Sequence, residues 1–196
     1  SFVEFVDYGV EYKVYPKVVA EATENLLFDS VGNLYTTTST GGSDKLNQYR
    51  AEDYAFEMTI EMPPAAGQLT GITFDYYSRI FVASQSDSTI HVAEASPDFS
   101  VFTWVGTLSG VGNPKKLEGL QIAPNGEVLA ASGDIIRYDF FTGEKLGSFD
   151  APNDLFPVPL TVDNWGRIYT ADYENGSGTA PADIYRFSPQ GELEKW

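Results

Sequence analysis

The chain has 196 residues, among them 12 Lys and Arg, 28 Asp and Glu and no Cys, so its formal net charge is −16 at pH 7. This charge argues against nucleic acids and anionic membranes as ligands, because their phosphates are neutralised by Lys and Arg. The lack of Cys excludes disulfides and thiolate metal sites, and no apolar run approaches the roughly 18 residues that insert across a membrane. Cations, neutral or cationic small molecules and basic proteins remain as ligands, although an acidic surface also serves solubility alone.

The N-terminal segment matches the C-terminal end of the chain. Phe2–Val14 aligns in register with Asp183–Trp196, so that Gly9 meets Gly191. Residues 1–19 are therefore predicted to be the outer two strands of a split blade, whose inner strands would have to follow the last residue. Three arrangements meet this expectation: further sequence that closes the ring, an open ring, or four blades with an extra hairpin. The first is favoured because ring closure protects strand edges.

A second pattern occurs four times. Each copy has a stretch of alternating apolar and polar residues, a turn rich in Asp, Asn and Gly, and a second alternating stretch, which is typical of a β-hairpin. Successive copies begin about 40–50 residues apart, the length of a propeller blade. Gly32 takes the positive-φ position in the first turn, whereas Ser78 replaces it in the second and predicts a somewhat different turn. The copies are Asn25–Ser39, Gly71–Gln85, Gly119–Gly133 and Pro159–Tyr173.

Two further strands follow each copy. Asp134–Phe149 and Asp183–Trp196 each contain a strand, a turn with Gly and another strand, and residues 44–62 and 88–108 occupy the same place earlier. No helical periodicity persists beyond ten residues. The chain is thus predicted to be one all-β domain, a β-propeller with four complete four-stranded antiparallel blades plus the N-terminal strand pair. The predicted blades are residues 20–66, 67–114, 115–154 and 155–196.

The repeat resembles known propeller families. The pattern G-h-x-h-D-x-x-G-x-h-Y-h-A-D, followed by I-Y-R-F-x-x-x-G, is similar to NHL-type repeats and to the gluconolactonase-like, six-bladed propellers of the strictosidine-synthase-like superfamily. The resemblance implies a divalent metal, often calcium, in the central channel, held by a Glu, an Asn and an Asp next to innermost strands. Glu24, four residues before Phe28, matches the Glu of that family.

The other implied ligands match less well. The positions equivalent to Glu24 in the later copies are Thr70, Glu118 and Val158, and a valine cannot bind a metal. Two carboxylates at the channel mouth would repel one another unless they share a cation or a proton. Calcium binds six to eight oxygens. The expected site is thus a central Ca²⁺ held by Glu24 and Glu118, with the remaining oxygens from Thr70, backbone carbonyls or two residues that echo the Pro-Asn-Asp of the family, Asn153 and Asp154. The alternative is that both Glu side chains simply reach solvent.

Catalytic sets of other kinds are poorly represented. His91 is the one histidine, and it lies in an alternating outer strand away from the axis, where a structural role is expected because it lacks an orienting partner in the sequence. No G-x-S-x-G motif or His-rich metal triad occurs.

Exposed aromatic residues are the second kind of candidate. Tyr76, Tyr77 and Trp165 lie in predicted turns and are expected to contact a ligand or partner. A different set shares one register position in the second strand of each copy and is predicted to be core between blades: Tyr35, Phe81, Leu129 and Tyr169.

These patterns favour a non-catalytic propeller that binds a partner protein or a small ligand, within a larger assembly or alone. An extracellular or exported location is expected from the glycosylation sequon at Asn175. The alternative is a calcium-dependent lactonase or esterase in which Glu24 and Glu118 hold a metal that polarises a carbonyl and activates water.

Overall fold

The fold is all-β, with four antiparallel sheets, in a computed structural model that describes residues 23–38, 44–111, 117–150, 157–172 and 184–194. Within these ranges no helix occurs, so none could span a membrane. Each sheet is a meander of four consecutive strands. The predicted fold class and the four complete blades are therefore confirmed. The N-terminal strand pair expected over residues 1–19 lies outside the described residues.

The four blades follow one another in the chain. The first contains β1 (Asn25–Phe28), β2 (Leu34–Thr38), β3 (Lys45–Tyr49) and β4 (Phe56–Ile60). The second contains β5 (Leu69–Phe74), β6 (Arg79–Ser84), β7 (Thr89–Ala95) and β8 (Phe102–Leu108). The third contains β9 (Leu117–Ile122), β10 (Glu127–Ser132), β11 (Asp134–Asp139) and β12 (Lys145–Phe149). The fourth contains β13 (Pro157–Val162), β14 (Ile168–Asp172), β15 (Ile184–Phe187) and β16 (Leu193–Glu194).

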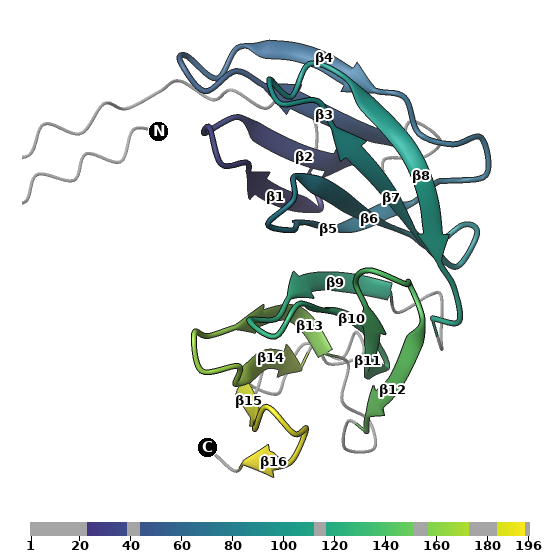
Figure 1. The fold of residues 1–196 in the computed structure, drawn as a ribbon, viewed down its shortest axis with the longest axis vertical. Coiled ribbons are helices and arrows are strands. Elements are labelled where there is room, and N and C mark those ends of the chain that lie inside the picture. Colours follow the sequence, from purple (N-terminus) through teal and green to yellow (C-terminus); the bar gives the residue numbers. More distant parts are fainter. Residues whose placement is uncertain (1–22, 39–43, 112–116, 151–156, 173–183, 195–196) are drawn as a thin grey trace, which may run out of the picture.

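The blades are arranged as a β-propeller. Figure 1 shows the first strand of each blade on the inner side and the fourth strand on the outer side. The inner strands pack consecutively, β1 against β5, β5 against β9 and β9 against β13. Residues just before or within these strands, far apart in the sequence, are thereby brought together at the centre.

An aspartate closes the hairpin turn between the first and second strands of three blades. In the second blade, Asp75 accepts hydrogen bonds from the backbone N–H groups of Tyr77 and Arg79 at 2.8 and 2.9 Å. Asp29 and Asp163 make the equivalent pair of bonds in the first and fourth blades. An Asp at the start of a tight turn satisfies backbone donors that the ladder leaves unpaired, so the sequence dictates the turn locally.

A different turn was predicted for the second blade, but the structure shows the same turn as in the first blade. Ser78 adopts φ 62°, in the left-handed region, where the corresponding Gly32 has φ 94°. Its N–H donates to the Asp75 carbonyl at 3.3 Å, as that of Gly32 donates to the Asp29 carbonyl at 3.2 Å. The two strands and the aspartate cap therefore impose the same turn on a serine, at the cost of strain that glycine avoids.

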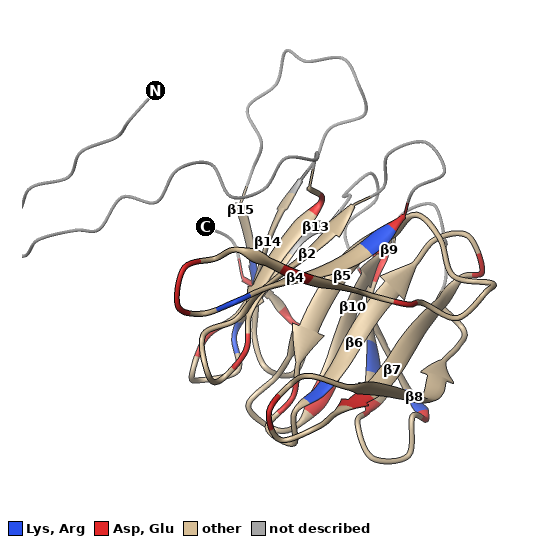
Figure 2. Cartoon of the chain, turned by 90° about the horizontal axis from the view of Figure 1, so that it is seen from above, with Lys and Arg blue, Asp and Glu red and all other residues tan. Residues whose placement is uncertain are grey.

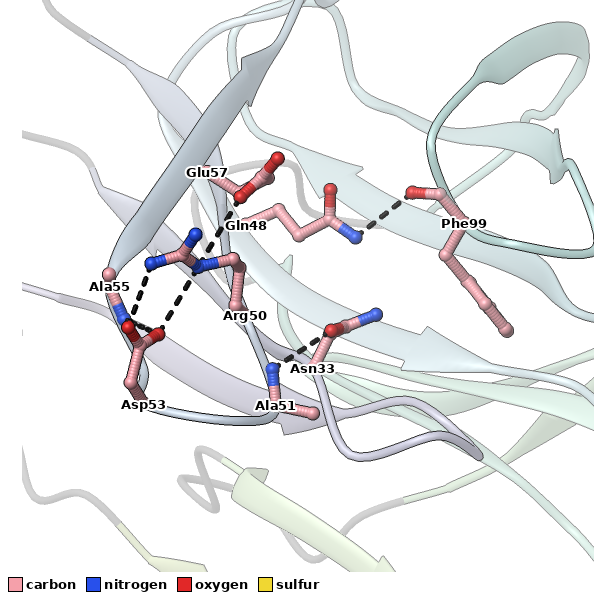
Figure 3. A network of polar contacts seen from close by, with 8 residues as sticks. All are labelled: Asn33, Gln48, Arg50, Ala51, Asp53, Ala55, Glu57 and Phe99. Atoms are coloured by element: carbon pink, nitrogen blue, oxygen red, sulfur yellow. Dashed lines mark hydrogen bonds and ion pairs between the residues drawn. The ribbon is translucent and has the colours of Figure 1, made fainter.

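Three apolar layers between neighbouring blades form the core. The predicted core position of the second strand faces these layers, and Tyr35, Phe81 and Leu129 are buried there. Tyr169, in the fourth blade, is only partly buried. Polar groups also cross between blades, since the buried amide of Gln48 donates to the Phe99 carbonyl of the second blade at 3.0 Å (Figure 3).

Two glycines allow the inner strands to approach closely. A Cβ at Gly71 would lie 2.9 Å from the Glu118 carbonyl oxygen and 3.0 Å from the Leu120 nitrogen. A Cβ at Gly119 would lie 3.0 Å from the Cβ of Leu160 in the next blade. Only glycine fits where the backbones of β5, β9 and β13 come together near the axis.

Candidate functional site

A central cavity lies among the inner strands of all four blades. It has a volume of about 280 Å³, and its lining includes Glu24, Thr70, Glu118, Gln121 and Leu160. The first strand of each blade contributes to it or begins beside it, because these strands converge on the axis. The cavity thus gathers the residues that the repeat alignment places at equivalent points of successive blades.

Glu24 and Glu118 both line this cavity. Burial raises the pKa of the Glu118 carboxyl, and the negative charge of Glu24 raises it further. The two groups therefore lie close enough for their charges to interact. Such a pair can share a proton or a cation, because either one relieves the repulsion between the carboxylates.

Of the remaining expected metal ligands, Thr70 also lines the cavity. The Thr70 hydroxyl donates to the Leu117 carbonyl at 2.5 Å, so its hydrogen is engaged within the wall between two blades. Asn153 and Asp154 lie outside the described residues, as does the sequon residue Asn175. In the part of the chain that the structure describes, no group of three or more His, Asp or Glu side chains could hold a metal ion.

A second candidate site lies at the turns between strands, on the opposite end of the blades from the start of β1, β5, β9 and β13. Tyr76 and Tyr77 follow β5, Trp165 follows β13, and all three side chains are exposed. Sequence reasoning missed two neighbours, Phe140 and Phe141, in the turn between β11 and β12. The signal was present, since an adjacent pair of phenylalanines in a turn is not needed to build a hairpin.

Tyr77, Phe140 and Phe141 form what we term the aromatic cluster. The rings of Tyr77 and Phe140 are stacked, with centroids 5.8 Å apart and an interplanar angle of 16°. The Phe141 ring lies 3.8 Å from that of Phe140 and 5.8 Å from that of Tyr77. The cluster joins the turns of two neighbouring blades, and Tyr77 and Phe141 remain exposed.

Arg79 holds the aromatic cluster in place through contacts with Phe140. Its guanidinium donates to the Phe140 carbonyl at 2.7 Å and lies 5.2 Å from the centroid of the Phe140 ring. The same guanidinium donates to the buried Asp75 carboxylate at 2.7 Å. The aspartate that closes the hairpin turn thus also orients the arginine that holds the cluster, so the aromatic surface is preorganised.

Trp165 has different neighbours. It lines a cavity of about 310 Å³ between the third and fourth blades, together with Asn125, Glu127 and Phe149. The Arg167 guanidinium lies 4.8 Å from its ring centroid and donates to Asp163 at 2.6 Å. The three aromatic residues predicted to contact a partner therefore fall at two places on the rim of turns, Tyr76 and Tyr77 at one and Trp165 at the other.

His91 is a core residue. Its ring is buried on β7, with Nε2 2.8 Å from the Asp87 carboxylate and 3.1 Å from the Thr89 hydroxyl. The indole of Trp104 covers it edge-on, with centroids 6.0 Å apart. The histidine thus links β7 to the turn that precedes it, and it lines neither cavity.

Charged side chains are unevenly represented over the surface. Figure 2 shows Asp and Glu at many turns and strand ends and few Lys or Arg. Several of the arginines are already paired with carboxylates, among them Arg79, Arg137 and Arg167. Over the whole chain Asp and Glu outnumber Lys and Arg by 28 to 12, which favours a cationic ligand over an anionic one.

No protein family and no curated protein sequence matches this chain. Solved structures do resemble it. A streptogramin B lyase is 19% identical over 87% of this chain and 53% of its own, with a TM-score of 0.66. A catalytically inactive virginiamycin B lyase from Staphylococcus aureus, with quinupristin, is 15% identical over 95% of this chain and 58% of its own, with a TM-score of 0.68. A luciferin-regenerating enzyme is 14% identical over 88% of this chain and 62% of its own, with a TM-score of 0.66.

At these identities the likeness shows the fold alone. The chain spans little more than half of the length of the two lyases. The expected resemblance to propellers is thus supported at the level of the β-propeller, while its assignment to the six-bladed, gluconolactonase-like branch is not confirmed.

Proposed function

We propose that this protein is a non-catalytic, exported β-propeller that binds a basic protein partner through the aromatic residues at its rim of turns. The observation that carries the proposal is the aromatic cluster. Tyr77 and Phe141 are exposed although they are large and apolar, and Arg79 and Phe140 hold them in one arrangement. Rigid exposed aromatic side chains lose little entropy on binding and dominate the energetics of many interfaces.

The charge of the chain supports a basic partner. A formal net charge of −16 attracts Lys- and Arg-rich surfaces and accelerates their encounter. An arginine or lysine of the partner can also lie over the faces of exposed rings in cation–π contacts. The sequon at Asn175 supports export. If Asn175 is glycosylated, the secreted protein should show a shift in gel mobility that a glycosidase removes. Secretion without a glycan would mean that the sequon is no evidence for export.

A labelled peptide of alternating Arg and Trp tests the aromatic cluster. We expect it to bind with an affinity that falls at least about tenfold in Tyr77→Ala and in Phe141→Ala, because each removes an anchor. Phe56→Ala is the matched control, since Phe56 is an exposed phenylalanine on the first blade, and it should leave the affinity unchanged. Fluorescence anisotropy provides the measurement.

Two outcomes of this titration would contradict the proposal. One is an equal loss of affinity in Phe56→Ala, which would show general adhesion of the peptide. The other is unchanged binding in both cluster variants. Affinity should also weaken between low and physiological salt, because exposed charges are screened within about 8–10 Å, and a peptide of alternating Arg and Ser should bind more weakly than the Arg–Trp peptide.

A second function is supported by the central cavity: a calcium-dependent lactonase or esterase. Glu24 and Glu118 come from different blades to one cavity, and the charge of Glu24 contributes to the raised pKa of Glu118. A cation bound there would relieve this repulsion, polarise a substrate carbonyl and activate water. Its remaining ligands would be oxygens from outside this pair.

Glu118→Gln tests the cation and the repulsion together. The folded-state pKa of Glu118 is raised, so its contribution to the free energy of unfolding falls as pH rises from the unfolded pKa through the folded one. Without calcium, the variant should therefore melt above wild type at neutral pH, and the difference should shrink on acidification. With calcium at a hundredfold excess over Kd, wild type should gain about 2.7 kcal/mol, and the variant should gain less.

Thermal melts with calcium and with a chelator provide the measurement. If calcium does not change the melting temperature of wild type, the proposal of a metal-dependent hydrolase is wrong. If the melting temperatures of wild type and variant depend on pH in the same way, the two carboxylates do not repel one another in the folded state.

A further inference from the structure

The two terminal faces of the four-blade stack differ from the faces between blades. We term the face of each blade that packs on the preceding blade its leading face, and the opposite one its trailing face. Ile72, Leu120 and Leu160 occupy the same repeat position on leading faces, and each is at most 7% exposed. Leu26 occupies this position in the first blade and is 56% exposed. Phe28, two residues later on the same strand, is equally exposed.

The trailing face of the fourth blade shows the complementary difference. The residue after the start of the third strand is fully buried in the first three blades, where it is Leu46, Ile90 and Ile135. Ile184 is the equivalent residue of the fourth blade, paired with Ala171 as Ile135 is paired with Ala131. It is 64% exposed.

The same residue type at the same register thus changes from buried to exposed for one reason: in the described structure no blade covers it. An aliphatic side chain at this position contributes burial energy only when a leading face packs against it. The chain carries both halves of such a contact, an unused leading face on its first blade and an unused trailing face on its fourth.

We infer that the trailing face of the fourth blade, around Ile184, binds the leading face of the first blade, around Leu26 and Phe28, of a second copy of this chain. The contact would continue the packing that already joins the four blades three times over.

This contact is heterologous, since it joins two different surfaces. Two copies can use both contacts at once and close into one ring, which covers all four terminal faces. The contact lies on the flat faces of the end blades, whereas the aromatic cluster lies at the turns between the second and third blades, so the inference is independent of the proposed function. Salt separates the two: screening should strengthen association of two copies that each carry −16 charges, and should weaken binding of a basic peptide.

Sedimentation velocity of the full chain over a range of concentrations tests the inference. Wild type should form a dimer, and Ile184→Asp and Leu26→Asp should each weaken dimerisation at least about tenfold, because a charge would be buried in an apolar contact. Val101→Asp is the matched control, an exposed apolar residue in the turn between β7 and β8, and should still dimerise. All three substituted side chains are exposed in the single chain, so melting curves should show that the variants remain folded.

Mixing the two interface variants gives the sharpest result. Ile184→Asp retains an intact leading face and Leu26→Asp an intact trailing face, so their mixture should regain one contact and form a heterodimer. A wild-type monomer at all concentrations would overturn the inference and would mean that another part of the polypeptide, or a different protein, covers these faces. A dimer unaffected by both variants, or one that the mixture fails to restore, would overturn the head-to-tail arrangement.

Discussion

Gly71→Ala should lower the free energy of unfolding by about 2–3 kcal/mol, the cost of inserting a methyl group where the packing leaves no room. The added Cβ would lie 2.9 Å from both the Glu118 carbonyl oxygen and the Cγ of Leu120. Neither neighbour can move alone, because β9 is held by its ladder to β10 and Leu120 packs in the layer between the second and third blades. The inner strands would have to separate, which would also open the central cavity.

Urea unfolding of Gly71→Ala and of Gly106→Ala provides the comparison. Gly106 lies on β8, and a Cβ there would meet nothing within 4 Å. The control should therefore stay within about 0.5 kcal/mol of wild type. Equal stability of the two variants would show that the inner strands are not packed as closely as the structure has them.

Asp75→Ala should cost about 3 kcal/mol, at the lower end of the effect of breaking a buried ion pair. The Asp75 side chain is 1% exposed and accepts two backbone N–H groups in addition to the Arg79 guanidinium. Its removal leaves a largely buried arginine without its carboxylate and two turn donors without an acceptor. Arg79 would also lose the group that orients it toward Phe140, so binding of the Arg–Trp peptide should weaken.

Asp163→Ala is the matched control for this variant. Asp163 closes the same turn of the fourth blade and pairs with Arg167, but its side chain is 21% exposed and that of Arg167 is 34% exposed. Water can replace much of what is lost there, so the expected cost is about 1 kcal/mol. Differential scanning calorimetry of both variants separates the effect of burying the ion pair from the effect of losing the turn hydrogen bonds. A larger loss of stability in Asp163→Ala than in Asp75→Ala would contradict this explanation.

The local structure of the blades could be predicted from the sequence because its causes are local. Alternation of apolar and polar residues sets which side chains face the neighbouring blade, and an Asp followed by a Gly closes the turn. The first copy of the repeat accordingly forms β1 and β2 with the turn between Phe28 and Leu34. The repeat alignment also placed Glu24 and Glu118 at equivalent points of two blades, and both line the central cavity.

Other features depend on contacts between segments that are distant in the sequence. Tyr77 was visible as a turn residue, but Phe140 and Phe141 reach it only because the second and third blades pack side by side. Ser78 adopts a glycine-like φ because the strands on either side and Asp75 close the turn around it.

The burial of equivalent repeat positions shows most clearly what depends on local sequence and what depends on tertiary contacts. The sequence by itself determined that Ile135 and Ile184 occupy the same register on the same face of their blades. Only the tertiary structure decided that Ile135 is fully buried while Ile184 is exposed. The physical reason is that alternation specifies the direction of a side chain relative to its own sheet, whereas burial requires a second sheet to lie against that face.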